Sequence, residues 1–278
     1  MLKRILAGVV GIPLILVIVF FSGSVPILID IAIALVCTIS VGEFAHATKT
    51  LKLFQISIPS ILFALAYPML MTYGYGLLTV YVYTAVMLAM MVFFHTTISF
   101  RHFAAIFSMT LVITVSLSTI ITMKNADPQR SAFYFLLALW LPWLADIGAY
   151  FTGSFLGRHK LCPKISPKKT IEGAVGGTIF CVLATCGLAW LFADVIYQHA
   201  VRVDYLSLSI LSFVGSLCSI IGDLSFSVVK RTFDVKDYGH LIPGHGGMLD
   251  RFDSVIFVSP LIMFYISYFP VLYLQTAP

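Results

Sequence analysis

Stretches of apolar residues long enough to cross a lipid bilayer constrain the fold of this chain more than any other feature. A membrane-spanning α-helix needs about 20 mostly apolar residues. Nine such stretches fall at roughly 5–21, 25–46, 56–74, 76–94, 103–123, 132–153, 174–196, 206–229 and 255–274. Because a spanning segment must satisfy its backbone hydrogen bonds internally, we expect an all-α polytopic integral membrane protein with about nine transmembrane helices.

The charged residues are few and lie beside the apolar stretches. They make up 10% of the chain, against about 25% in a typical soluble domain. The net charge of +5 therefore indicates orientation signals and binding groups rather than a nucleic-acid partner. Lys3 and Arg4 followed by an apolar run resemble a signal peptide, but no A-x-A cleavage site follows, so we expect this run to remain as the first span. The five cysteines form no C-x-x-C pair, and we expect neither a disulfide framework nor a zinc site.

The distribution of basic residues predicts the orientation. With the N-terminus in the cytoplasm, fourteen of the 17 lysines and arginines lie inside, and Lys124, Arg130 and Arg202 lie outside. This asymmetry follows the positive-inside rule and supports nine spans with two polar segments, 154–173 and 230–254, in the cytosol. The boundary near Tyr73–Gly76 is critical, because fusing the third and fourth spans would change the parity of the topology.

The chain divides into an N-terminal region of about five spans, 1–130, and a C-terminal region of about four spans, 131–278. The polar residues suited to chemistry lie in the second region. The first five spans contain two acidic residues, Asp30 and Glu43. We interpret these as helix-end or interhelical hydrogen-bonding groups; the alternative is a functional role, since ionisable groups inside a membrane are costly.

A polar segment from Ser227 to Asp253, SVVKRTFDVKDYGHLIPGHGGMLDRFD, interrupts the apolar sequence. Its four carboxylates suit a hard divalent cation, which prefers oxygen ligands. Its basic side chains suit phosphate groups. The segment therefore predicts a binding site for a divalent metal ion together with a phosphate-containing substrate.

The end of the eighth span adds a stripe of polar residues. Asp223, Ser227, Lys230 and Arg231 have the spacing of one helical face. Lys230 and Arg231 alone are explained by an anchor at the end of a span. Asp223 lies about two turns inside the apolar run, where an unpaired carboxylate is costly. We therefore expect a cation as its partner.

Two acids, Asp250 and Asp253, open the ninth span on one face. Helix capping is an alternative explanation for both. Gly246 and Gly247 precede them and would let backbone amides approach a phosphate. Magnesium commonly takes one or two protein carboxylates and completes its shell with water and substrate phosphates, so Asp223 and Asp250 are the expected ligands.

A third polar element follows the sixth span. Asp146 lies at the end of that span, and the Ser166-Pro167 pair is typical of a helix N-cap and first position. Lys168, Lys169 and Thr170 would then lie at a helix N-terminus, which favours phosphate. A basic loop that only sets topology is the alternative. For His245, donation to a phosphate, action as an acid and a plain turn position remain open.

These residues resemble a known family. The stretch from Ser227 to Asp253 is similar to the signature of the phosphatidate cytidylyltransferases, and Asp146, Tyr150 and the 163–173 segment resemble the same family. The resemblance implies an integral membrane enzyme that condenses CTP with phosphatidic acid to give CDP-diacylglycerol and pyrophosphate. It also implies Mg2+, with a second, monovalent cation such as K+ nearby, and a homodimer in the bacterial inner membrane with its active site facing the cytoplasm.

The resemblance and the chemistry together give the expected site residues. The catalytic set is Asp223, Asp250, Lys230, Arg231, Lys236, Asp237, His245 and Arg251. The substrate-binding set is Lys168, Lys169, Thr170, Asp146, Ser227, Gly246, Gly247 and Asp253. The expected metal ligands are Asp223 and Asp250.

Two other functions are compatible with parts of this pattern. A CTP-dependent lipid-alcohol kinase would share the metal–nucleotide site but would release CDP. A transporter would use the acids inside the spans as an ion path. The second alternative leaves the dense Lys, Asp and Gly segments unexplained.

Overall fold

The structure is a computed structural model, and it describes residues 13, 17, 18, 21, 25–241 and 246–274. The expected first span, 5–21, lies almost wholly outside these residues, and so does His245. Eight long helices are described: α2 (Ile27–Ala47), α3 (Phe54–Thr72), α4 (Gly76–Phe93), α5 (Phe100–Ala126), α6 (Ser131–Leu156), α7 (Ile171–Leu191), α8 (Tyr205–Thr232) and α9 (Leu249–Tyr268).

Seven helices of the described residues are long and apolar enough to cross a membrane, by length and composition. These are α2 to α8, with α6 and α7 extended by the short helices η2 (Pro128–Arg130) and η3 (Phe192–Ile196). The expected separation of the third and fourth spans is confirmed, because α3 ends at Thr72 and α4 begins at Gly76. Gly74 turns the chain between them with φ +83°, a conformation that glycine adopts without steric cost. The total of nine spans stays a prediction.

The last predicted span, 255–274, is displaced. The helix α9 begins at Leu249 and ends at Tyr268. Pro270 explains the earlier end, since the residue before a proline is disfavoured in the α conformation. Phe269 accordingly has φ −130° and ψ 82°.

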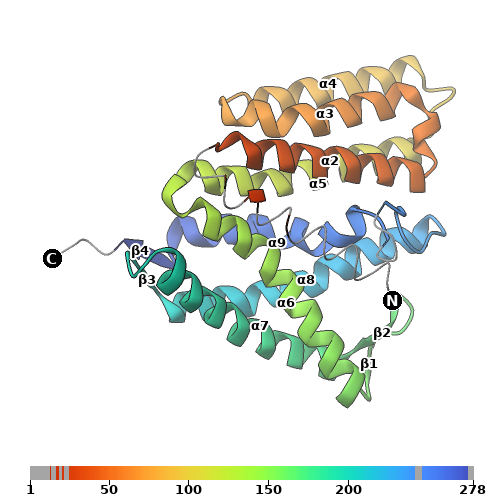
Figure 1. Cartoon of the computed structure of the whole chain (residues 1–278). Coiled ribbons are helices and arrows are strands. Elements are labelled where there is room, and N and C mark those ends of the chain that lie inside the picture. The colour runs from red at the N-terminus through yellow and green to blue at the C-terminus, as the bar shows by residue number, and fades with distance from the viewer. Residues whose placement is uncertain (1–12, 14–16, 19–20, 22–24, 242–245, 275–278) are drawn as a thin grey trace.

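The fold is mostly helical, but the all-α expectation needs a correction. Two antiparallel ribbons are present: β1 (Lys160–Cys162) with β2 (Ser166–Thr170), and β3 (Val201–Val203) with β4 (Leu272–Leu274). Figure 1 shows the two ribbons at opposite ends of the molecule. Each consists of short strands joined to helix ends, where backbone groups freed from the helices find partners in the ribbon.

The helices form successive layers (Figure 1). The pair α3 and α4 lies at the top of the view, α2 and α5 follow, and α6 and α7 lie at the other side. Helix α9 packs against α5, α8 and α2, so it joins the two halves of the chain. The division into regions 1–130 and 131–278 stays a prediction.

Small residues allow α6 and α7 to approach closely. A Cβ added to Gly177 would lie 2.7 Å from the Ala145 carbonyl oxygen, and one added to Gly173 would lie 2.8 Å from the Ala149 carbonyl oxygen. Contacts of this kind are typical of membrane helices, where small residues let backbones meet. They fix the start of α7, and with it strand β2, against the end of α6.

A buried ion pair ties α2 to α5. The Lys124 ammonium pairs with Asp30 and also donates to the Pro26 carbonyl at 3.2 Å. Thr72 of α3 donates to the other Asp30 oxygen at 3.4 Å. The interhelical interpretation of Asp30 is therefore confirmed, and the charge of each buried partner is compensated by the other.

Candidate active site

Asp223, the acidic residue of α8, has a cationic partner. Asp223 pairs through Oδ2 with the ammonium of Lys169, which belongs to β2. Its Oδ1 accepts a hydrogen bond from Ser227 Oγ at 3.3 Å, one helical turn further along α8. The prediction that Asp223 needs a cationic partner is confirmed, and the partner comes from the polar segment 154–173. Both side chains of the pair are about a quarter exposed, at 23% and 24%, so a substrate can reach them.

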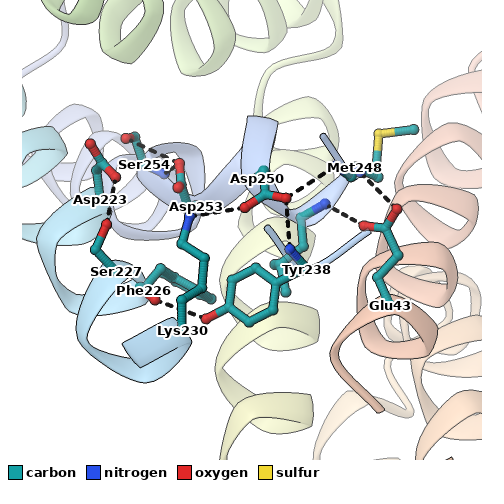
Figure 2. Close-up of polar contacts among 12 residues, drawn as sticks. Glu43, Asp223, Phe226, Ser227, Lys230, Tyr238, Met248, Asp250, Asp253 and Ser254 are labelled. Atoms are coloured by element: carbon teal, nitrogen blue, oxygen red, sulfur yellow. Dashed lines mark hydrogen bonds and ion pairs between the residues drawn. The ribbon is translucent and has the colours of Figure 1, made fainter. Parts of the chain in front are cut away.

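Asp250 is held by three donors in the first turn of α9 (Figure 2). Lys230 Nζ lies 2.9 Å from Oδ1. The backbone amides of Tyr238 and Gly247 donate to Oδ2 at 2.9 and 3.0 Å. The Asp250 side chain is 3% exposed. Its charge is therefore compensated by a lysine and by the backbone of the segment that joins α8 to α9.

Tyr238 lies beside the Lys230–Asp250 pair. The Lys230 ammonium lies 5.4 Å from the centre of its ring, within the range of a cation–π contact. The Tyr238 hydroxyl donates to the Phe226 carbonyl at 2.9 Å. Burial, reinforced by the charges of Asp250 and Asp253, raises the pKa of the Tyr238 phenol above its ordinary value. The phenol is therefore a neutral donor over the physiological pH range.

Glu43 is a residue of this site that the sequence-based sets omit. It lies in the last turns of α2, and its two oxygens accept hydrogen bonds from the backbone amides of Met248 and Leu249 at 3.0 and 2.9 Å. Figure 2 shows it approaching the start of α9 from the side opposite Lys230. The helix-end interpretation of Glu43 is confirmed. The one signal in the sequence was an acid inside an apolar span.

Further carboxylates lie in the same electrostatic neighbourhood. Asp253 is buried and accepts from the Ser254 amide at 2.7 Å. It interacts electrostatically with Asp223, Asp146 and Lys230. Asp146, in turn, interacts with Lys169, Asp223 and Arg251. The ends of α6 and α8 and the start of α9 therefore gather acids and bases of both predicted polar segments at one place.

The predicted helix start at Ser166-Pro167 is wrong. Residues Ser166–Thr170 form strand β2, and α7 begins at Ile171. The N-cap is Thr170, whose Oγ1 accepts from the Gly173 amide at 3.1 Å. A residue before proline favours extended backbone, and pairing with β1 satisfies this stretch as a strand. Lys168 and Lys169 therefore lie before the helix, with Lys168 exposed and Lys169 directed to Asp223.

Glu172 links the two ends of the β1–β2 ribbon. Its carboxylate accepts from the backbone amides of Arg158 and His159 at 3.0 and 3.2 Å, and it contacts the His159 ring nitrogen at 2.6 Å. Because Glu172 is in the first turn of α7, these bonds join the end of α6 to the start of α7. Lys168 and Lys169 are thereby carried on a short, doubly anchored ribbon.

Other members of the predicted sets lie at the surface around this centre. Arg231, Lys236, Asp237 and Arg251 are exposed. Gly246 has φ +86°, and the Gly247 amide donates to Asp250 in this structure. An approach of these amides to phosphate stays a prediction, as does every role expected for His245, which lies outside the described residues.

The comparison with known families decides the classification. The model of the Cytidylyltransferase family matches residues 2–269. The chain belongs to this family. The site described above, including its two acid–lysine pairs, lies within the matched residues.

The chain also resembles individual curated proteins. It is 41% identical over 152 residues to a phosphatidate cytidylyltransferase of Bacillus subtilis (strain 168), covering 54% of this chain and 52% of that protein. It is 48% identical over 129 residues to the proteins of that name from Staphylococcus saprophyticus and from Staphylococcus aureus (strain COL), covering 46% of this chain and 47% of each. These matches span about half the length of the curated relatives.

Proposed function

We propose that this protein is a phosphatidate cytidylyltransferase, which condenses CTP with phosphatidic acid to give CDP-diacylglycerol and pyrophosphate. Family membership and the names of the relatives support this assignment. The observation that carries it is a set of two acid–lysine pairs: Lys169 of the 154–173 segment pairs with Asp223 of α8, and Lys230 pairs with Asp250 within the 230–254 segment. A site with paired acids and lysines beside apolar helices suits a reaction between a nucleotide and a membrane lipid.

The reaction requires charge neutralisation more than a strong base. A phosphate monoester has a second pKa of about 6, so the lipid phosphate is largely dianionic at neutral pH. One of its oxygens attacks the α-phosphorus of CTP, a new P–O bond forms, and the bond from that phosphorus to the bridging oxygen breaks as pyrophosphate leaves. Lys169 and Lys230, with the exposed Lys168, Arg231 and Arg251, would hold the anionic groups together.

A magnesium ion suits the chemistry of this donor set. The side chains of Asp223 and Asp250 would hold it in exchange for their lysine partners, Lys169 and Lys230, and Asp146 and Asp253 lie in the same electrostatic neighbourhood. Within the described residues, no three His, Cys, Asp or Glu side chains converge as a ready metal site. Magnesium often takes one or two protein carboxylates with water and substrate phosphates. When bound, it would neutralise charge on the triphosphate. We also propose a monovalent cation such as K+ as a second ion.

We further propose that the polar end faces the cytoplasm of a bacterial plasma membrane, that the N-terminus is on the same side, and that the protein is a homodimer. The lipid chains would stay in the bilayer while CTP arrives from the cytosol.

Orientation is tested with single cysteines in a cysteine-free chain. Lys164, between β1 and β2, and Arg202, in β3, are exposed, and their two ribbons lie at opposite ends of the molecule (Figure 1), so Lys164→Cys and Arg202→Cys are suitable positions. An impermeant thiol reagent should label the first in inverted vesicles and the second in intact cells; the reverse result contradicts the orientation.

The function is tested by measuring pyrophosphate release from purified protein with CTP, magnesium and phosphatidic acid. Release should require all three components and should collapse in Asp250→Asn. Appearance of CDP in place of pyrophosphate would identify a lipid-alcohol kinase. Absence of CTP turnover with every phospholipid acceptor, in protein shown to be folded, would exclude the enzyme assignment and leave transport.

A further inference from the structure

The start of α9 is capped by a side chain from a distant helix. Met248 precedes α9 and gives it no side-chain cap in the described part of the chain. Instead the two oxygens of Glu43 accept one hydrogen bond each from the amides of Met248 and Leu249, at 3.0 and 2.9 Å. These amides belong to the group that a helix leaves unsatisfied at its N-terminus. A carboxylate there also complements the helix dipole.

The segment before α9 is shaped to admit this carboxylate. A Cβ added to Gly239 would lie 2.6 Å from Glu43 Cδ, and a Cβ added to Gly247 would lie 2.7 Å from the same atom. Real Cβ atoms do not approach so closely. The Glu43 carboxylate is therefore enclosed between two parts of the segment, and both parts need glycine where they pass it.

The next residue of α2 makes a second contact with this segment. The Phe44 ring lies 6.3 Å from the Phe233 ring, edge to face, and 5.9 Å from the Tyr238 ring. Such ring pairs have a preferred geometry and resist displacement. The last turns of α2 therefore contact the chain after α8, at Phe233 and Tyr238, and the chain at the start of α9, at Met248 and Leu249.

The residues held by Glu43 are neighbours of those that hold Asp250. Asp250 Oδ2 accepts from the amides of Tyr238 and Gly247. Tyr238 precedes Gly239, and Gly247 itself packs on the Glu43 carboxylate. A displacement of Glu43 would move both amide donors and change the orientation of the Asp250 carboxylate toward Lys230.

We propose that Glu43 is a positioning residue of the active site, which fixes Gly239 and residues 247–249 so that Asp250 is presented to the substrate together with Lys230. This inference rests on the proposed function. A positioning residue differs from a purely structural cap in one respect. A structural cap affects how much protein is folded, whereas a positioning residue also changes the rate constant of each folded molecule.

The first test compares Glu43→Gln with Asp30→Asn. Both substitutions remove an acid from α2, but Asp30 lies at the other end of the helix and pairs with Lys124. Glutamine keeps one acceptor oxygen and presents an amino group to the second amide. Loss of one charge-assisted hydrogen bond predicts a fall in kcat of about 10- to 100-fold and a rise in the magnesium concentration for half-maximal rate. Asp30→Asn should lower the unfolding temperature and leave kcat per folded molecule unchanged. Equal kinetic constants in Glu43→Gln and wild type would overturn the inference.

The second test is a double-mutant cycle with Gly239→Ala. In the wild-type background the added methyl group meets the Glu43 carboxylate, so activity should fall. In a Glu43→Ala background that carboxylate is gone, and the same substitution should cause little further loss. Additive losses would show that the two positions act independently and would overturn the inference.

Hydrogen exchange provides a readout that needs neither CTP nor metal. In Glu43→Gln the amides of Gly247, Met248 and Leu249 should exchange faster than in wild type, and unchanged exchange would overturn the inference. This measurement also separates the two proposals. A wild-type protein that releases no pyrophosphate would refute the proposed function. The exchange rates, and a double-mutant cycle measured by the free energy of unfolding instead of activity, would still decide whether Glu43 fixes the residues around the start of α9.

Discussion

Separating the Lys230–Asp250 pair tests the energetics of the proposed active site. The two side chains are 12% and 3% exposed, and the Nζ–Oδ1 distance is 2.9 Å. Removing one partner of a buried pair leaves an uncompensated charge, which commonly costs about 3–5 kcal/mol. The structure predicts that the two single substitutions are unequal, because the partners have different numbers of other contacts.

Asp250→Asn should be the more destabilising of the two. Asparagine can keep its one carbonyl oxygen toward Tyr238 N and Gly247 N, which donate to the same Asp250 oxygen. Its amino group then faces the Lys230 ammonium in place of the negatively charged oxygen at 2.9 Å, and the Tyr238 ring and the charge of Asp253 are the remaining favourable neighbours of the ammonium. We expect a loss of about 3–5 kcal/mol in the free energy of unfolding. Lys230→Met keeps most of the side-chain volume and leaves Asp250 with two backbone donors. We expect about 2 kcal/mol, the value of one hydrogen bond to a charged group.

The double variant completes the cycle. Because neither charge then lacks its partner, the combined loss should be smaller than the sum of the single losses by about 2 kcal/mol. Denaturant unfolding in mixed micelles, followed by circular dichroism, measures all three variants. Arg231→Met is the matched control, since this exposed neighbour makes no ion pair within the described residues, and surface changes usually stay within about 0.5 kcal/mol. Additive losses, or a larger effect of Lys230→Met, would refute this reasoning.

Three further tests address other parts of the structure. Lys169→Met should reduce the rate of pyrophosphate release about tenfold more than Lys168→Met, because it also removes the charge that neutralises the acid on α8; equal initial rates would contradict the pairing. Gly177→Ala should lower the unfolding temperature, since its Cβ meets the α6 backbone, whereas Gly187→Ala, with open space around it, should stabilise α7 by up to about 1 kcal/mol. Tyr238→Phe should cost about 1 kcal/mol, the usual net value of one hydrogen bond, by removing the hydroxyl that donates to the Phe226 carbonyl; unchanged denaturation would show that this bond contributes little.

The positions of the helices could be predicted because hydropathy is a local property. The turn between α3 and α4 was readable from its tyrosines and glycines, and Gly74 adopts the backbone angle that only glycine favours there. The end of α9 was misplaced because the apolar run continues beyond it. Pro270 contained the necessary signal, but hydropathy alone does not register the conformational restriction that proline places on Phe269.

Strand β2 shows where local patterns become ambiguous. Ser166-Pro167 suits the start of a helix and suits an extended chain equally well, since proline fixes φ at a value common to both. Pairing with β1 selects the strand, and that choice depends on residues outside the motif. The true cap, Thr170, could be recognised once the strand was known.

The members of the active site could be selected by residue type, but their partners could not. Asp223 and Asp250 stand out because carboxylates are costly beside apolar spans. Lys169 reaches Asp223 from strand β2, and Glu43 reaches the start of α9 from α2; no spacing in the sequence encodes such contacts. The approach of phosphate to Gly246 and Gly247 stays a prediction. The structure shows a role that the sequence did not indicate: Gly239 and Gly247 make room for the Glu43 side chain.

The contact of Glu43 with α9 also has a consequence for biosynthesis. At about 5–20 residues per second, the 205 residues that separate Glu43 from Met248 take roughly 10–40 s to translate. During that interval α2 is already made, and the acid on it has no helix start to cap. Until α9 is made, the Glu43 carboxylate lacks the two amides that it binds in the folded protein, so water or another donor must satisfy it. This end of α2 therefore reaches its final environment only late in synthesis.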